Sequence, residues 1–536
     1  MIRRKFLAHT LGVTLASLFA RDAFAQQSAH DMPGMSGMRG MQGMSGMSGM
    51  ASMPAGQMNM APALAPPDAL PAGAPMSSLR TLANESREPG VFRATLVALP
   101  VKRELLPGKP TPFWQYGSGT PGPVVGPLID VREGDTVEIH FVNRLPQPST
   151  IHWHGLPVPP DQDGNPTDLV APGATRIYRF TLPKGSAGTY WYHPHPHSLT
   201  AEQVYRGLAG PFIVRADDDP LAGWPERHLF FSDLKLADDG SIVPNDTMDW
   251  MNGREGQFTL VNGARRPQIV VAGNERWRVW NGSNARYLRL TFDDGRPFTQ
   301  VGTDGGLLEA PREGLTELLL APAERAELIV SPGGASGRAV LTAGQYDRSK
   351  MAMPRGSLPP DPALPLADVR FEPASGAATH GLPKRLRAVP ALGQPVARKA
   401  VVFGEAMDMG KMMSQSSESK GWRPAGMKFL VNGVAFEPHR TTLTSRRGDI
   451  ELWSIQNDTD MDHPFHLHGT QFQVIERERG GVTTPEPFRA WRDTVNVRRG
   501  EIVRIATTQT QRGERMFHCH ILEHEDLGMM GTLKVI

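Results

Sequence analysis

The chain of 536 residues contains a single cysteine, Cys519, so no internal disulfide can hold its fold together. Cys519 stands between His518 and His520, and His524 and Met529 follow within ten residues. Thiolate, imidazole and a weakly held thioether are the donors of a blue-copper electron-transfer site. Neighbouring side chains of a strand point to opposite faces, so we expect the two flanking histidines to hold a second metal centre. This stretch predicts two metal centres joined by one covalent bridge.

A zinc site is the competing interpretation of the cysteine and the histidines around it. Zinc takes four protein ligands in a closed site, or three ligands and a water. Ten of the 17 histidines fall into short clusters, which is too many for one such site. They are His152, His154, His193, His195, His463, His466, His468, His518, His520 and His524. The sequence therefore favours several metal ions of another kind.

The N-terminal residues 1–25 are typical of a removable export signal. Arg3 and Arg4 precede an apolar run, and Ala23-Phe24-Ala25 is a small-residue cleavage pattern. The arginine pair predicts the twin-arginine route and a periplasmic protein; an ordinary export signal with an accidental arginine pair is the alternative. No later stretch has the ~18 apolar residues that span a bilayer.

Residues 26–84 are predicted to form a disordered, Met-rich linker. Methionine recurs every third position from Met32 to Met53, among glycine and serine, and prolines continue the segment. Thioethers are soft donors that prefer Cu(I), so we expect this tract to gather cuprous ions. A solvated linker without a role is the alternative.

Three similar units follow the linker. Residues 134–143, 273–281 and 448–457 each show a turn, an alternating strand and a final asparagine, and residues 172–180, 322–330 and 499–505 form a second matching set. We expect an all-β chain of three Greek-key β-sandwich domains, at 85–218, 219–380 and 381–536. The histidine clusters occupy only the first and third. A formal charge of +2 gives no argument for nucleic-acid binding.

Four motifs together resemble the multicopper oxidases: H-W-H-G, Y-H-P-H, H-P-F-H-L-H-G and H-C-H-x₃-H-x₄-M. The C-terminal motif and the run FLVNGVAF resemble the bacterial periplasmic copper-efflux (cuprous) oxidases, which are laccase-like. The resemblance implies cupredoxin-like domains and four copper ions. The implied type 1 ligands are His463, Cys519, His524 and Met529. The implied type 2 ligands are His152 and His466, and the type 3 ligands are His154, His193 and His520 for one ion and His195, His468 and His518 for the other.

The resemblance also implies a reaction. Cu(I), phenols or aromatic amines would give single electrons, and dioxygen would be reduced to water, in a role in copper tolerance. Asp163 and Glu525 match the acidic proton-relay positions of the family, although either could be an ordinary loop carboxylate. His197 falls outside the pattern and is expected to be a surface or supporting group.

The residues expected to bind the electron donor depart from the family pattern. Thr459 stands where the family has an aspartate, beside Asp460, Met461 and Asp462. Further candidates for binding Cu(I) are Met407, Asp408, Met409, Met412 and Met413, and a mobile loop is their alternative role. A copper-sequestering protein with incidental oxidase activity and a scaffold without catalysis are the competing functions. A monomer is the default expectation.

Overall fold

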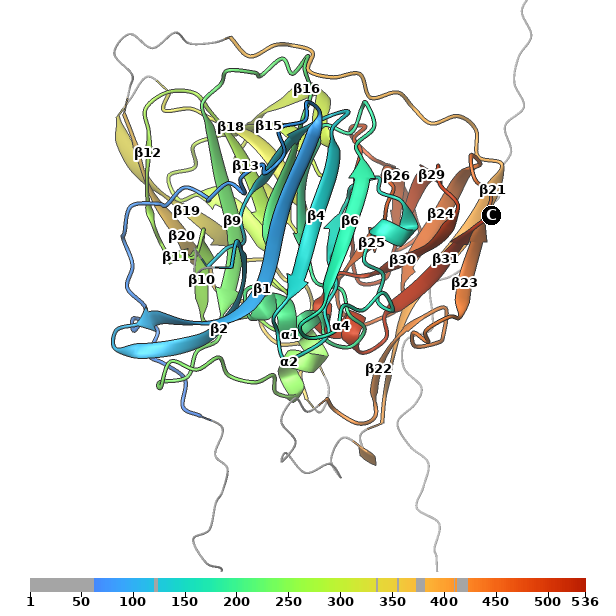
Figure 1. Ribbon diagram of the computed structural model, residues 1–536, viewed down its shortest axis with the longest axis horizontal. Helices are drawn as coiled ribbons and strands as arrows, with labels where there is room; N and C mark the ends of the chain where they lie inside the picture. The colour runs from blue at the N-terminus through green and yellow to red at the C-terminus, as the bar shows by residue number, and fades with distance from the viewer. Residues whose placement is uncertain are drawn as a thin grey trace, which may run out of the picture. The chain divides into compact units, whose positions relative to one another are not determined.

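The computed structural model describes residues 62–119, 124–333, 336–353, 356–372, 381–408, 410–411 and 423–536. The predicted export signal, the regular part of the Met tract and the candidates Met409, Met412 and Met413 lie outside them. Contacts join the described part into one unit that begins at residue 62. Its strands form six sheets that pack as three β-sandwiches, as the alternating patterns predicted (Figure 1).

The first sandwich has one sheet in the order β2-β1-β4-β6 and another in the order β3-β8-β7-β5. Their bounds are β1 Val91–Leu106, β2 Lys109–Gly117, β3 Ile129–Arg132, β4 Thr136–Asn143, β5 His152–His154, β6 Thr175–Thr181, β7 Gly188–His193 and β8 Gly210–Arg215. A short 3₁₀ helix, η1, covers Pro160–Gln162.

The second sandwich has the orders β11-β10-β9-β13-β18-β15-β16 and β12-β20-β19-β14-β17. Its strands are β9 Glu226–Leu234, β10 Phe258–Val261, β11 Ala264–Arg265, β12 Gln268–Val271, β13 Glu275–Asn281, β14 Leu288–Phe292, β15 Phe298–Thr303, β16 Gly306–Leu315, β17 Glu317–Leu320, β18 Arg325–Val330, β19 Gly337–Gly344 and β20 Leu364–Phe371.

The third sandwich has the orders β22-β21-β24-β29-β26-β27 and β23-β31-β30-β25-β28. Its strands are β21 Ala397–Met407, β22 Met427–Val431, β23 Thr441–Ser445, β24 Ile450–Asn457, β25 His463–Leu467, β26 Phe472–Arg479, β27 Val482–Pro485, β28 Thr494–Val497, β29 Glu501–Thr508, β30 Gly513–Cys519 and β31 Met530–Val535.

The two repeated patterns in the sequence form antiparallel neighbours in each sandwich: β4 with β6, β13 with β18, and β24 with β29. Each final asparagine is buried, and its side-chain amide donates to a backbone carbonyl of another segment. These bonds are Asn143 to Val170 (2.8 Å), Asn281 to Leu320 (3.1 Å) and Asn457 to Val497 (2.9 Å). The sequence repeat therefore corresponds to the same antiparallel strand pair and the same kind of asparagine hydrogen bond in each sandwich.

Residues 62–84 correct one expectation. They are ordered against the sandwiches, because Ala65, Leu70 and Leu82 are at most 7% exposed. Their backbone also bonds to the body: the Ala65 amide donates to Leu236 O (2.9 Å) and the Leu82 amide to Leu128 O (2.8 Å). The prediction of a linker that extends to residue 84 is wrong for this part. The prolines suggested a linker, but the apolar side chains between them are buried against the sandwiches, and this burial stabilises an ordered segment.

Three short helices gather at one end of the sandwiches: α1 (Thr200–Tyr205), α2 (Thr247–Asn252) and α4 (Leu522–Asp526) (Figure 1). Both α1 and α2 contact α4, which follows the cysteine motif directly. The Asp526 carboxylate accepts the backbone amides of Thr200 (3.2 Å) and Ala201 (3.1 Å) at the start of α1. The C-terminal motif is thus fixed to both other sandwiches.

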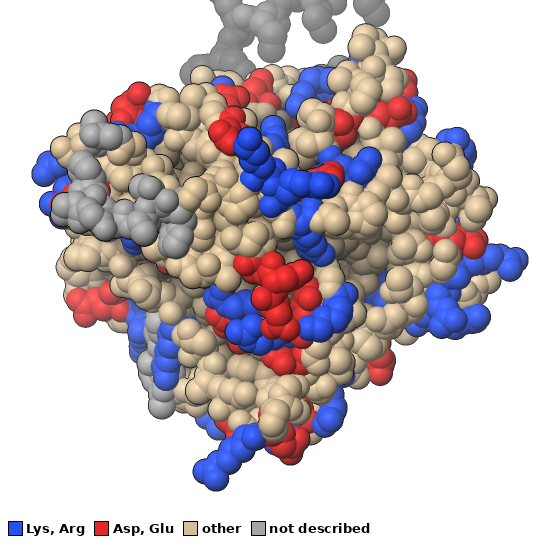
Figure 2. Space-filling view, turned by 90° about the horizontal axis from the view of Figure 1, so that it is seen from above, with Lys and Arg blue, Asp and Glu red and all other residues tan. Residues whose placement is uncertain are grey.

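Charged side chains of both signs lie in adjacent groups on the face shown in Figure 2. Within the described residues, no helix is long and apolar enough to cross a bilayer.

Candidate metal centre

A small site forms around Cys519, at the end of β30. Strand β25 pairs with β30, and His463 at its start lies with its Nδ1 3.3 Å from the Cys519 Sγ. His524, from α4, lies with its Nδ1 4.0 Å from the same sulfur and 3.2 Å from the His463 Nδ1. All three side chains are fully buried, and Met529 is buried in the same core.

The outer nitrogens of these two histidines are held by the protein. Thr459 Oγ1 is 2.7 Å from the His463 Nε2, and the Met251 carbonyl is 3.1 Å from the His524 Nε2. Each Nδ1 is therefore left facing the sulfur. Burial lowers the pKa of His463 to about 3, so its imidazole is neutral and free to donate an electron pair to a metal.

A second, larger cluster brings together the eight remaining histidines of the motifs, all fully buried. They come from the first and third sandwiches: His152, His154, His193, His195, His466, His468, His518 and His520. Nε2 atoms of opposite sandwiches face each other, as in His152 with His466 (3.3 Å) and His195 with His518 (3.2 Å). No histidine cluster arises within the described part of the second sandwich.

The donor atoms of this cluster suit metal ions. Sets of three lie within 4.8 Å of one another: His152, His154 and His193; His152, His466 and His468; His195, His468 and His518. The His520 ring lies 5.0 Å from that of His154 and 5.4 Å from that of His193. Both ring nitrogens of His520, and the Nε2 of His193, lack a partner among the described residues. Buried nitrogens without hydrogen-bond partners are costly in a metal-free protein and are expected of ligands.

The two clusters are joined through the backbone of three consecutive residues. The Cys519 side chain enters the small site, whereas His518 and His520 enter the large one. Their alternation follows from the strand geometry of β30.

Two carboxylates touch the large cluster. Asp163 lies with Oδ1 2.9 Å from the His152 Nδ1 and Oδ2 3.3 Å from the His468 Nδ1. Glu525 lies with Oε2 3.2 Å from the His518 Nδ1 and Oε1 3.5 Å from the His195 Nε2. Burial, and the nearby Asp526, raise the pKa of Glu525 well above its ordinary value. These contacts fix the orientation of the histidine rings that they touch.

A third carboxylate, Asp493, was not predicted from the sequence. Its Oδ1 is 3.0 Å from the His154 Nε2, and its carbonyl is 2.8 Å from the His466 Nδ1. Arg325 of the second sandwich donates to both oxygens of this carboxylate, at 2.7 and 2.5 Å. Asp493 lies outside every histidine motif. The one feature of the sequence that could have pointed to it is its position directly before strand β28. The second sandwich, which carries none of the motif histidines, thus contacts the cluster through Arg325 and Asp493.

The candidates for the donor site are dispersed. Met461 is fully buried in the core beside Cys519, but Asp460 is exposed and paired with Arg499 (2.8 Å). Asp462 is buried and accepts the Tyr346 hydroxyl (2.6 Å). Met407 is half-buried against the same core, and the exposed Asp408 pairs with Lys411 (3.1 Å).

The sequence did not reveal that other methionines share this core. They are Met251, Met351 and Met427, with Met248 at its edge. His197, the histidine outside the motifs, packs its ring against Phe436 at 5.0 Å.

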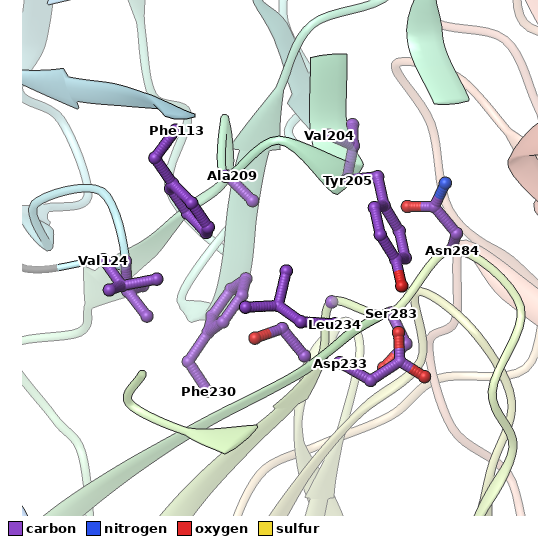
Figure 3. Close-up of a pocket in the computed structure, with 14 residues that line it drawn as sticks. Phe113, Val124, Val204, Tyr205, Ala209, Phe230, Asp233, Leu234, Ser283 and Asn284 are labelled. Atoms are coloured by element: carbon purple, nitrogen blue, oxygen red, sulfur yellow. The ribbon is translucent and has the colours of Figure 1, made fainter. Parts of the chain in front are cut away.

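A separate small pocket of about 30 Å³ lies beside α1 and β9 (Figure 3). Tyr205, Asp233 and Ser283 line one side, and each has a polar atom without a partner among the described residues. Phe113 and Val124 line the other side. This space suits one or two ordered waters rather than an organic substrate.

Comparison with known proteins agrees with this geometry. Family models described as multicopper oxidase match residues 103–219 and 406–536. "Multicopper oxidase mco" of Staphylococcus haemolyticus is 31% identical over 427 residues, which cover 78% of this chain and 83% of that protein. "Cell division protein FtsP" of Xenorhabdus nematophila is 31% identical over 431 residues, which cover 78% of this chain and 84% of that protein.

Solved structures agree as well. The structure titled "Multicopper oxidase from Campylobacter jejuni: a metallo-oxidase" has a TM-score of 0.81 and 43% identity, and the match covers 88% of this chain and 98% of that one. With two buried donor clusters in cupredoxin-like sandwiches, the chain belongs to the multicopper oxidase family and is an oxidoreductase that uses dioxygen.

Proposed function

We propose that the chain is an exported oxidase that takes single electrons from Cu(I), and also from phenols, and reduces dioxygen to water in a role in copper tolerance. The observation that carries this proposal is the covalent link His518-Cys519-His520, whose side chains enter both donor clusters. Over one cycle, four cuprous ions each lose one electron, and dioxygen gains four electrons and four protons to become two waters.

Four copper ions are proposed as resident cofactors. His463, Cys519, His524 and Met529 would hold the type 1 ion. The eight remaining motif histidines would hold the other three, divided as the family resemblance implies. Copper bound at these residues supplies the one-electron redox chemistry and the reduction of dioxygen.

Hydroxyl, carbonyl and carboxylate groups of the protein fix the orientation of the histidines in these sites. The Thr459 hydroxyl and the Met251 carbonyl fix the ring orientation of His463 and His524 in the small site. In the large cluster, Asp163 and Glu525 each contact two histidines. We assign to these two carboxylates the delivery of protons, since each lies at the edge of the cluster where water forms.

Cu(I) is favoured as a donor by two observations. Methionines from the second and third sandwiches gather in the core around Cys519, and thioethers select Cu(I). The similar protein of Campylobacter jejuni is titled a metallo-oxidase. The Met tract, outside the described residues, is proposed to collect the same ion.

Oxygen uptake by the copper-loaded protein tests this function. Stabilised Cu(I) and a dimethoxyphenol are supplied separately, to the mature full-length protein and to a form that lacks residues 26–61. A strong preference for Cu(I), weakened by the truncation, supports a cuprous oxidase with a built-in collector. Equal or better use of the phenol, unaffected by the truncation, identifies a laccase instead.

The competing functions make different predictions. A copper-sequestering protein would protect cells equally well with Cys519→Ser, which abolishes oxidation but leaves the Met tract intact. A scaffold, as the resemblance to cell-division proteins would allow, would need no copper at all. Export is tested by replacing Arg3 and Arg4 with lysine and measuring the periplasmic fraction.

A further inference from the structure

A pocket of about 350 Å³ lies between the second and third sandwiches, and none of the motif histidines lines it. Strands β15, β16 and β17 contribute residues of the second sandwich, and β26, β27 and β28 contribute residues of the third. Leu318, Leu319 and Leu320 give the pocket an apolar wall. Sites for small molecules have volumes of about 300–1,000 Å³, so this pocket has room for an organic molecule.

The pocket is rich in guanidinium groups. Its lining contains five arginines and three acids: Arg312, Arg325, Arg477, Arg492 and Arg498, with Asp304, Glu324 and Glu486. Two of these arginines also pair with carboxylates outside the lining, Arg325 with Asp493 (2.5 Å) and Arg477 with Glu501 (3.5 Å). The other three arginines have no such partner outside the lining, among the residues that the structure describes.

The ring of Phe488 brings two of these three guanidinium groups together. The Arg312 Cζ lies 4.0 Å from the ring centroid, and the Arg492 Cζ lies 5.3 Å from it. In the described part of the chain no carboxylate pairs with Arg312, which donates to the neutral side-chain oxygen of Gln300. Burial and the charge of Arg492 lower the pKa of Arg312, and Glu486 offsets them only in part. Two like charges are thus held close together.

The acids of the lining do not neutralise this pair. Glu486 is divided between Arg492 and Arg477, each at 3.1 Å. Asp304 accepts the backbone amide of Arg325 (2.7 Å), and Glu324 accepts that of Ala321 (2.8 Å). Burial raises the pKa of both acids, to about 8 for Asp304, so the Asp304 carboxyl is largely uncharged at neutral pH.

Many hydrogen-bond donors of the pocket are left over. A guanidinium presents five N–H groups, but the side chains of Arg312 and Arg492 each make one hydrogen bond to described residues. The exposed side chain of Arg498 makes none with them. Carboxylate and phosphate groups match the planar guanidinium fork with two parallel hydrogen bonds. The surplus of donors and charge therefore fits a ligand that carries such groups.

We propose that this pocket binds a small organic anion with two or more carboxylate or phosphate groups. Arg312 and Arg492 bind one anionic group beside Phe488, and the exposed Arg498 binds a second. The leucine wall contacts the carbon skeleton of the ligand. These residues touch no motif histidine, so the site is separate from both donor clusters.

Isothermal titration calorimetry on the copper-loaded full-length protein tests the site with two probes, tricarballylate and glycerol 2-phosphate. Ionic strength is held constant at about pH 7.5, so that general screening by salt is the same in every titration. The variants are Arg312→Gln and Arg498→Gln. The matched control is Arg265→Gln: Arg265 is half-buried, donates to the Leu70 carbonyl and lies over the Phe258 ring (5.9 Å), but it does not line this pocket.

We expect one site per chain for at least one probe, because charge-assisted hydrogen bonds hold each anionic group. Each variant should weaken binding by about tenfold or more, and the control should bind as the wild type does. The probe that binds more tightly identifies carboxylate or phosphate as the preferred group. Arg498→Gln alters an exposed side chain, so it decides the question even if Arg312→Gln does not fold. Absence of binding to both probes in the wild type, or undiminished binding in the folded variants, overturns the proposal.

Discussion

Arg325 connects the second sandwich to the carboxylate that contacts the large cluster. Its guanidinium is fully buried and donates to both oxygens of Asp493, which contacts His154, and to the Thr189 carbonyl of the first sandwich (2.8 Å). The single side chain therefore connects all three sandwiches. We predict that Arg325→Met destabilises the protein strongly and lowers its copper content.

The size of the effect follows from burial. Removing one partner of a buried ion pair leaves the other charge uncompensated and costs about 3–5 kcal/mol. Arg289→Met is the matched control, because Arg289 pairs with Glu317 on the surface of the same sandwich, with the two side chains 41% and 58% exposed. Exposed pairs contribute about 0–1 kcal/mol.

Equilibrium unfolding in urea, followed by tryptophan fluorescence, measures the difference. With a slope of about 3 kcal/mol/M, the Arg325→Met midpoint should fall by about 1 M or more, and the Arg289→Met midpoint by at most about 0.3 M. Copper content after loading gives the second readout. Equal midpoints and full copper content in both variants would refute the assigned role of Arg325.

Three further predictions concern single sites. Cys519→Ser should reduce oxygen uptake to background with both donors and abolish the blue colour, while circular dichroism stays unchanged because serine has nearly the same size. Gly155→Ala should cost at least ~2 kcal/mol more than Gly173→Ala; both residues have positive φ, but a Cβ at Gly155 would lie 2.2 Å from the Asp493 Oδ2, whereas one at Gly173 meets nothing within 4 Å. Equal losses in stability would contradict this. Glu405→Gln should stabilise the copper-loaded protein above about pH 7. Because folding raises the pKa of Glu405 from 4.5 to about 7, the folded state binds the extra proton, and wild-type stability falls as pH rises between these values. The variant should therefore gain about 2 kcal/mol over wild type at pH 8 and nothing below pH 4, as measured by urea unfolding at each pH.

Much of the fold could be predicted because its signals are local. Alternating apolar residues in 134–143, 273–281 and 448–457 predicted strands, and β4, β13 and β24 lie there. The motif histidines were recognisable because a ligand pair two residues apart on a strand reaches one face by geometry alone. The division of these ligands among types of copper stays a prediction from resemblance.

The remaining part of the site depends on contacts between distant residues. Asp493 and Arg325 are separated by 168 residues, and neither has a neighbour in the sequence that marks it. Proline-rich composition suggested a free linker as far as residue 84, whereas the side chains of Leu70 and Leu82 are buried against the sandwiches. Both the Asp493–Arg325 ion pair and the order of this segment depend on surfaces that form only when the sandwiches have folded.

The sequence by itself determined the strand content, the ten clustered histidines and the covalent bridge through Cys519, because residue type and spacing decide donor chemistry and alternation. Only the tertiary structure decided that Arg325 contacts the cluster from a sandwich without motif histidines, and that Glu405 lies near the small site with one carboxylate oxygen that has no hydrogen-bond partner among the described residues. The physical reason is that the cost of a buried charge depends on its partners, and partners far apart in the chain meet only in the folded protein.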